Sequence, residues 1–190
     1  IKKSILVIDM PKGTYEKSPS KALKNAKKIK KFTKCDAIKL EGGSKIRKSI
    51  KILVKNNIPV MSHIGLQPQN FSNNKKFRVM GRSKNEEKKI IYDLRSAEMA
   101  GSFSVVLESV TKNLANKINK ISKIPVIGIG ASNKCDGQIL VTEDLLGLLD
   151  KSPKFAKKYE NLRLKIKIAV KKYRSEVLKR SFPSKNNTFK

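Results

Sequence analysis

The sequence has few of the residues that mark disulfide-rich or membrane-spanning proteins. Its 190 residues include two cysteines, one histidine and no tryptophan. Cys35 and Cys135 lie far apart and lack metal-ligand spacing, which argues against a disulfide framework and favours a reducing, cytoplasmic location. No apolar run approaches the roughly 20 residues that cross a bilayer. The apolar run near the start is also too short for a signal peptide, so we expect no membrane partner.

Acidic residues are scarce as well. The chain has 15 Asp and Glu against 44 Lys and Arg, for a formal net charge of +29. This charge alone predicts a nucleic-acid partner. However, most of the basic residues are lysines spread along every segment, whereas specific recognition relies on the bidentate fork of arginine. A coding bias toward Lys, Ile and Asn gives the same pattern, so we predict no specific nucleic-acid partner.

Short apolar runs alternate with longer helical patterns. The strand candidates are residues 5–9, 37–40, 59–63, 104–108, 125–129 and 138–141. Apolar residues recur at helical spacing in three intervening stretches: Ala22, Ala26, Ile29 and Phe32 after the cap Ser18-Pro19; Ile90, Leu94 and Ala97; and Leu114, Ile118 and Ile121. Strands that alternate with helices predict βα units and a parallel sheet, so the fold class is α/β with six visible units.

The last part of the chain has a different pattern. One long basic helix is predicted over residues 153–182, because apolar residues repeat there at intervals of three and four: Phe155, Tyr159, Leu162, Ile166, Ala169, Tyr173 and Val177. We interpret the stripe as a core or subunit contact, with a membrane-surface helix as the alternative. No linker divides the chain, so we assign residues 1–182 to one domain and residues 183–190 to a loosely ordered tail.

Ionisable residues follow four of the predicted strands: Asp9, the pair Lys39 and Glu41, His63, and Glu108. In a barrel of parallel strands the carboxyl ends meet at one mouth, where active sites are built. The sequence therefore predicts a polar site at these strand ends.

Each of these residues also has a purely structural interpretation. Asp9 could cap a helix, Lys39 and Glu41 could form a salt bridge along one strand face, and Glu108 could cap a helix that begins near Thr111. His63, as a single histidine, could be a satisfied structural residue. The set favours a site, because a structural explanation would have to hold for every strand separately.

The residue types indicate metal-assisted enolate chemistry. A hard divalent cation takes oxygen ligands from Asp and Glu and polarises a keto acid as a Lewis acid. A lysine adds positive charge where the enolate oxygen develops, and a remaining carboxylate can remove the proton next to the carbonyl.

Several longer runs have a recognisable spacing. They are residues 38–43, 58–69, 79–82, 106–108, 124–131, 135–141, 144–147 and 153–155, and they include the patterns His-x-Gly-Leu-x-Pro-Gln and Cys-Asp-Gly-Gln-x-Leu-Val. In these runs the chain resembles the ketopantoate hydroxymethyltransferase family, in collinear order and over essentially its whole length.

This resemblance implies an enzyme of pantothenate synthesis. Members of that family transfer a hydroxymethyl group from 5,10-methylenetetrahydrofolate to 3-methyl-2-oxobutanoate, giving 2-dehydropantoate, with Mg²⁺ as cofactor. By motif, Asp9 matches the aspartate that binds the metal and the keto acid, and Lys39 the lysine that contacts the substrate. Glu41 matches the acid on the metal's side, Glu108 the general base, and His63 a supporting residue. Another metal-dependent keto-acid lyase or aldolase is the alternative, separable by its independence of folate.

The resemblance also implies a fold and an assembly. The expected fold is a (β/α)8 TIM barrel of the phosphoenolpyruvate/pyruvate type, as a cytoplasmic homodecamer. Family members begin earlier, with two strands and an Asp-Ser pair, so we expect this chain to lack the first two βα units and to be inactive by itself. Departures from the family pattern occur at Lys12, residues 74–77 and Ser132, which leaves the predicted metal and base positions unchanged.

Overall fold

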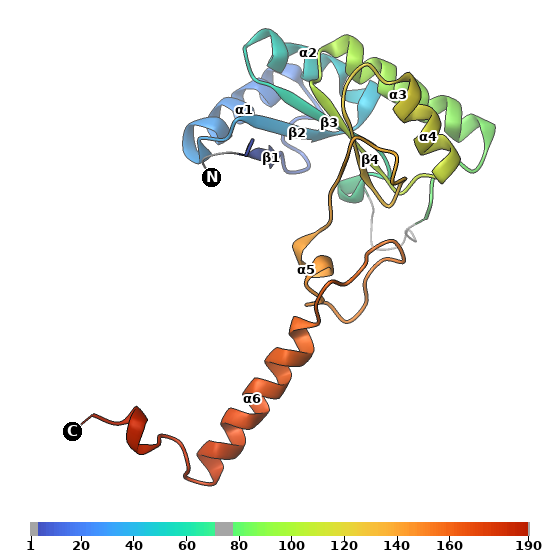
Figure 1. Ribbon diagram of the computed structural model, residues 1–190. Helices are drawn as coiled ribbons and strands as arrows, with labels where there is room; N and C mark the ends of the chain where they lie inside the picture. The colour runs from blue at the N-terminus through green and yellow to red at the C-terminus, as the bar shows by residue number, and fades with distance from the viewer. Residues whose placement is uncertain (1–3, 71–77, 190) are drawn as a thin grey trace. The chain divides into compact units, whose positions relative to one another are not determined.

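The computed structural model of the protein describes residues 4–70 and 78–189 (Figure 1). The chain forms two compact units, Ile1–Ile139 and Leu140–Lys190. The departure from the family pattern at residues 74–77 lies outside the described residues.

The first unit is built on one parallel sheet. In the described part of the chain its six strands stand in sequence order: β1 (Val7–Asp9), β2 (Ala37–Glu41), β3 (Val60–Gly65), β4 (Ser104–Glu108), β5 (Val126–Ile129) and β6 (Gly137–Gln138). Every neighbouring pair is parallel, which confirms the predicted α/β class with a parallel sheet. The sheet curls around the face that carries no helices (Figure 1).

Five predicted strands lie within two residues of the observed bounds, and the sixth is present but shorter than predicted. Residues 138–141 were expected to form a strand, but β6 ends at Gln138, and Ile139 and Val141 are about half exposed. Val141 is the N-cap of α5 (Thr142–Leu145), so the chain enters a helix before the strand can extend.

Four helices of the first unit connect the strands and cover one face of the sheet (Figure 1). They are α1 (Pro19–Thr33), α2 (Arg47–Lys55), α3 (Lys84–Ala100) and α4 (Lys112–Ile121), with short 3-10 turns η1 (Gly43–Ile46) and η2 (Pro68–Asn70). The Ser18 side chain caps α1 as predicted, by accepting the Lys21 N–H. The nine-residue α2 was not predicted, and Phe32, expected on the apolar stripe of α1, is 73% exposed.

Alternate residues of the central strands form the core with these helices. Ile38, Leu40 and Val60 pack against α1 and α2 in one apolar cluster. Ile64, Val105 and Leu107 pack against α3 and α4 in a second cluster. Because side chains alternate along a strand, the residues between these apolar ones face the opposite side of the sheet, away from the helices.

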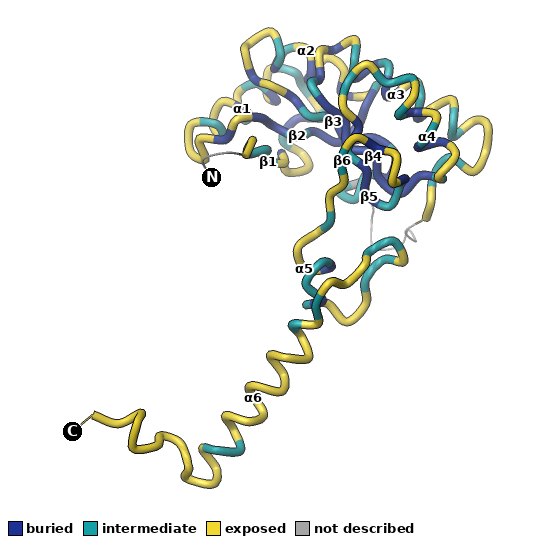
Figure 2. Tube along the Cα trace, viewed as in Figure 1, coloured by how far each residue is buried: buried dark blue, intermediate teal, exposed yellow. Residues whose placement is uncertain are grey.

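The second unit contains α5, α6 (Leu162–Leu178) and the 3-10 turn η3 (Lys185–Asn187). The helix predicted over residues 153–182 is therefore shorter, since it begins after the Asn161 cap, whose side chain accepts the Leu164 N–H. None of its residues is buried (Figure 2). Every second residue from Arg163 to Lys167 is basic, and Leu164 and Ile168 lie on the side of the helix opposite the predicted stripe.

The domain prediction for residues 1–182 stays a prediction, and the described tail residues up to Phe189 are exposed. Over the described ranges, 4–70 and 78–189, no helix combines the length and the apolar character that crossing a bilayer requires.

The close packing around Gly65, at the end of β3, leads to a testable prediction. Gly65 has a φ of +84°, and a Cβ there would collide with the Glu108 carbonyl oxygen. Gly65→Ala is expected to lower the free energy of unfolding by roughly 2–5 kcal/mol, from left-handed strain plus overpacking, in urea titrations. Gly13, also at +84° but with open space around it, is the matched control. Equal losses at both glycines would contradict the proposed collision.

Candidate functional site

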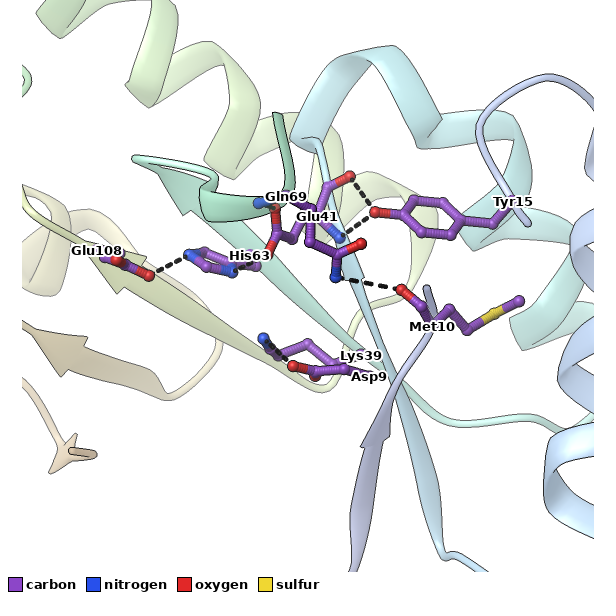
Figure 3. Close-up of polar contacts among 8 residues, drawn as sticks. All are labelled: Asp9, Met10, Tyr15, Lys39, Glu41, His63, Gln69 and Glu108. Carbon is purple, nitrogen blue, oxygen red and sulfur yellow. Dashed lines mark hydrogen bonds and ion pairs between the residues drawn. The ribbon is translucent and has the colours of Figure 1, made fainter. Parts of the chain in front are cut away.

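The strand register places the five predicted site residues on one face of the sheet. Paired residues of neighbouring strands point the same way, and residues two apart on one strand share a face. Asp9 pairs with Lys39, and Glu41 pairs with His63. His63 in turn pairs with Val106, two residues before Glu108. Asp9, Lys39, Glu41, His63 and Glu108 therefore project from the carboxyl ends of four strands toward the face without helices (Figure 3).

Lys39 forms its ion pair with Asp9 on β1. Its Nζ atom lies 2.8 Å from Asp9 Oδ2, and the Asp9 side chain is 55% exposed. The alternative of a Lys39–Glu41 salt bridge along β2 is wrong, because the neighbouring strand brings Asp9 directly opposite Lys39. The Asp9 carboxylate thus lies at the open side of the site beside a cation.

Glu41 and Glu108 are held on either side of the His63 ring. His63 Nε2 lies 3.1 Å from Glu108 Oε2, and its Nδ1 lies 3.5 Å from Glu41 Oε1. All three side chains are nearly excluded from solvent. Neither ring nitrogen has an aligned hydrogen bond within the described residues, so the contacts are ion-pair contacts. The alternative of Glu108 as a helix cap is not supported, because its carboxylate contacts the histidine.

The two carboxylates determine the charge of the histidine. Burial of the ring lowers the pKa of His63, but the carboxylates of Glu108 and Glu41 outweigh burial and raise the pKa above its usual value. The protonated form of His63, which this shift favours, places a positive charge between two buried carboxylates and offsets part of the cost of burying them.

Two further residues hold Glu41 in place, and neither was predicted. The Tyr15 hydroxyl donates to the Glu41 carbonyl oxygen at 3.2 Å and accepts the Glu41 N–H at 3.1 Å. The Gln69 N–H donates to Glu41 Oε2 at 3.1 Å, and its side-chain amide donates to the Met10 carbonyl oxygen at 3.2 Å (Figure 3). Gln69 ends the His-x-Gly-Leu-x-Pro-Gln run, which was a signal in the sequence, whereas nothing around Tyr15 indicated its contact.

The carboxylates of the site suit a hard cation that takes few of its ligands from the protein. Within residues 4–70 and 78–189, no group of three or more His, Cys, Asp or Glu residues is arranged to hold a metal ion. Asp9 and Glu41 supply two carboxylates on one face. Mg²⁺ commonly keeps several waters and binds through one or two carboxylates plus substrate, so these residues fit Mg²⁺ better than a metal that needs a full protein cage.

The family model for ketopantoate hydroxymethyltransferase matches residues 1–185 of the chain. The chain belongs to this family. Two of its relatives carry the name 3-methyl-2-oxobutanoate hydroxymethyltransferase. The one from Pelagibacter ubique is 49% identical and aligns with all of this chain and 72% of its own length. The one from Bartonella bacilliformis is 47% identical and aligns with 99% of this chain and 69% of its own length. The chain is thus a member of a transferase family.

Among solved structures, the carboxyl transferase domain of Rhizobium etli pyruvate carboxylase aligns with 65% of this chain and 22% of that chain. The identity is 13% and the TM-score 0.47, which is too low to support an argument.

The two described departures from the family pattern have simple environments. Lys12 is exposed. The Ser132 hydroxyl donates to Asn116 Oδ1 and accepts the Lys134 N–H, so this serine stabilises its own loop.

Tyr15 generates a prediction about pH. Burial raises the pKa of Tyr15 from 10.0 to about 12, although the hydrogen bond with the Glu41 backbone partly offsets this. Tyr15→Phe leaves the Glu41 N–H and carbonyl unpaired and is expected to cost roughly 1–3 kcal/mol of unfolding free energy at pH 8. The unfolded tyrosine ionises near pH 10 and the folded one near pH 12, so the wild-type advantage is present below pH 10 and lost as pH rises to 12. Chemical denaturation of both proteins from pH 8 to 12 measures this, and a constant difference would contradict it.

His63 generates a prediction about charge compensation. His63→Leu removes the positive ring between two buried carboxylates and is expected to lower the free energy of unfolding by roughly 3–5 kcal/mol at pH 6. His63→Gln keeps an N–H donor and should cost less. Urea titrations of the three proteins test this, and a loss below about 1 kcal/mol for His63→Leu would show that the ring does not compensate the carboxylates.

Proposed function

We propose that the protein transfers a hydroxymethyl group from 5,10-methylenetetrahydrofolate to 3-methyl-2-oxobutanoate, giving 2-dehydropantoate for pantothenate synthesis. Family membership supports the reaction class. The observation that carries the proposal is the arrangement of Glu108 and Glu41 around His63, beside the Asp9–Lys39 pair, on one face of the sheet. A base, a cation and two further carboxylates at one mouth are the groups that enolate chemistry on a keto acid needs.

The proposed complete fold is a (β/α)8 barrel of the phosphoenolpyruvate/pyruvate type. The six strands account for six of eight units, and β1 and β6 are the ends of the sheet, each paired on one side only in the described part of the chain. Two more βα units between these ends would close the barrel. By family resemblance they would also add an aspartate to the metal side of the site.

Glu108 is the proposed general base that removes the C3 proton of 3-methyl-2-oxobutanoate. Its carboxylate is largely buried and contacts His63 through Oε2, so we assign the proton-accepting role to Oε1. His63 supports this role by favouring the ionised form of the carboxylate, which can accept a proton, and its other nitrogen faces Glu41. Proton removal at C3 places negative charge on the keto oxygen of the substrate.

Lys39 and Asp9 are the proposed substrate-binding residues. The Lys39 ammonium is mostly buried and lies in the site, where it stabilises negative charge on the enolate oxygen. Asp9 and Glu41 would hold Mg²⁺, and when bound the ion supplies Lewis acidity to the keto group. Asp9 also orients Lys39 through the ion pair.

The second half of the reaction joins the two substrates. The C3 carbanion equivalent attacks the methylene carbon of the folate, and a carbon–carbon bond forms as the first of its two carbon–nitrogen bonds breaks. Water then displaces the second nitrogen, which breaks the second carbon–nitrogen bond and leaves the hydroxyl group on the product. Tetrahydrofolate leaves with two added protons: Glu108 can return the C3 proton to one nitrogen, which restores the base, and water supplies the other.

We further propose a cytoplasmic homodecamer, with no membrane or specific nucleic-acid partner. The α6 helix supports self-association, because Leu164, Ile166 and Ile168 are each at least half exposed. In an assembly this helix would pack between subunits and bury these side chains.

Proton exchange tests the base assignment without the folate. In the full-length protein, exchange of the C3 proton of 3-methyl-2-oxobutanoate into D₂O should require Mg²⁺. Glu108→Gln should slow this exchange about 10²–10⁴-fold, which is the usual contribution of a general base. Nuclear magnetic resonance of the substrate gives the rate.

Glu98→Gln is the matched control. The Glu98 side chain is also largely buried, but it binds the Ser122 hydroxyl and the Lys123 N–H just before β5, at the opposite end of the strands. This control should exchange at the wild-type rate. Unchanged exchange in Glu108→Gln would overturn the base assignment, and transfer without folate would favour a lyase or aldolase.

A further inference from the structure

We propose that Gln69 is a positioning residue that fixes the Asp9 and Glu41 carboxylates relative to each other for divalent-cation binding. The inference rests on the proposed function in one respect, because it takes Asp9 and Glu41 as the residues that would hold the cation. It goes further, because it proposes that the loop after β3 determines how the carboxylates at the ends of β1 and β2 are placed relative to each other.

Gln69 is connected to the ends of both strands that carry these carboxylates. Its main-chain N–H donates to Glu41 Oε2 at 3.1 Å. Its side-chain Nε2 donates to the carbonyl oxygen of Met10, the residue that follows Asp9. The two contacts span 28 and 59 residues of sequence, so neither arises from local chain geometry. Figure 3 shows Gln69 between Glu41 and Met10, at the ends of the two strands.

The Met10 main chain is held on both sides. Its N–H donates to the Lys39 carbonyl oxygen at 3.1 Å, and its carbonyl oxygen accepts the Gln69 amide. The Met10 side chain is fully buried. The backbone next to Asp9 is therefore fixed by one bond from β2 and one from Gln69, and loss of the Gln69 bond leaves the end of the three-residue β1 less restrained.

Glu41 depends on Gln69 for the orientation of one oxygen. Tyr15 holds the Glu41 backbone, and His63 lies 3.5 Å from Oε1. The Gln69 N–H is the hydrogen bond that the described residues make to Oε2. A carboxylate that is fixed through both oxygens presents its remaining lone pairs in set directions, which is how hydrogen-bond partners of metal ligands raise metal affinity.

The amide of Gln69 is poorly explained by stability alone. Its Oε1 atom is buried and has no hydrogen-bond partner within the described residues. A buried unpaired acceptor opposes folding and offsets the benefit of the one bond to Met10. Removing the amide should therefore change the stability little, while a positioning role predicts a clear loss of metal affinity.

Gln69→Met tests the proposal, because methionine has a similar length and no donor, and the main-chain N–H remains. Mn²⁺ binding to the full-length protein, followed by electron paramagnetic resonance, should weaken about 10–100-fold. The midpoint of urea denaturation should stay at the wild-type value. In C3 proton exchange, the Mg²⁺ concentration for half-maximal rate should rise by the same factor, while the rate at saturating Mg²⁺ falls less than about threefold.

Asn56→Ala is the control. Asn56 also donates a side-chain amide to a backbone carbonyl, that of Ile52, but at the C-terminus of α2, before β3 and away from the site. It should bind Mn²⁺ like the wild type. If Gln69→Met does not fold, Gln69→Asn, with an amide one methylene too short to reach Met10, makes the same comparison and should also weaken Mn²⁺ binding.

Unchanged Mn²⁺ affinity in the Gln69 variants, or an equal loss in Asn56→Ala, would overturn the positioning role. Absence of C3 proton exchange in a wild-type protein that binds Mn²⁺ would instead count against the proposed function. The two failures are therefore distinguishable, because metal binding is measured without substrate.

Discussion

Parallel pairing in a fixed register is the constraint on which the site depends. Asp9 opposite Lys39 and Glu41 opposite His63 place charged groups from separate strands within contact distance, and the alternation of side chains sends all of them to one face. A shift of one residue in any pair would turn a charged side chain toward the apolar clusters under the helices, where it would find no partner. The same register that builds the core therefore assembles the site.

The buried part of the site places one histidine between two carboxylates. Glu41 and Glu108 lie in a nearly solvent-free environment, and each faces one nitrogen of the His63 ring. The histidine offsets part of the cost of burying the carboxylates, and Tyr15 and Gln69 restrain Glu41 from two further directions. Asp9 is different, since its side chain is mostly exposed and paired with Lys39, which suits a group that must reach solvent-borne ligands.

The second unit differs from the first in how its apolar residues are used. Its long helix carries Leu, Ile and Val residues between lysines and arginines, and none of its side chains is buried within the chain. Its apolar residues do recur at intervals of three and four from Leu162, but Leu164 and Ile168 lie on the opposite side of the helix. The large positive charge of the chain is similarly spread over its surface, and the five site residues themselves include two cations and three acids.

The sequence by itself determined the alternation of strands and helices, the α/β class and the family, because apolar periodicity and collinear motifs are local properties of the chain. It also indicated Asp9, Lys39, Glu41, His63 and Glu108 as polar residues at strand ends. The tertiary structure alone decided which of them meet. Lys39 pairs with Asp9 rather than with Glu41. The Tyr15 hydroxyl forms hydrogen bonds with the Glu41 backbone, 26 residues away in the sequence, and the Gln69 amide forms one with Met10, 59 residues away. These contacts depend on strand register and loop paths, which bring distant residues together and leave no periodic signal in the sequence.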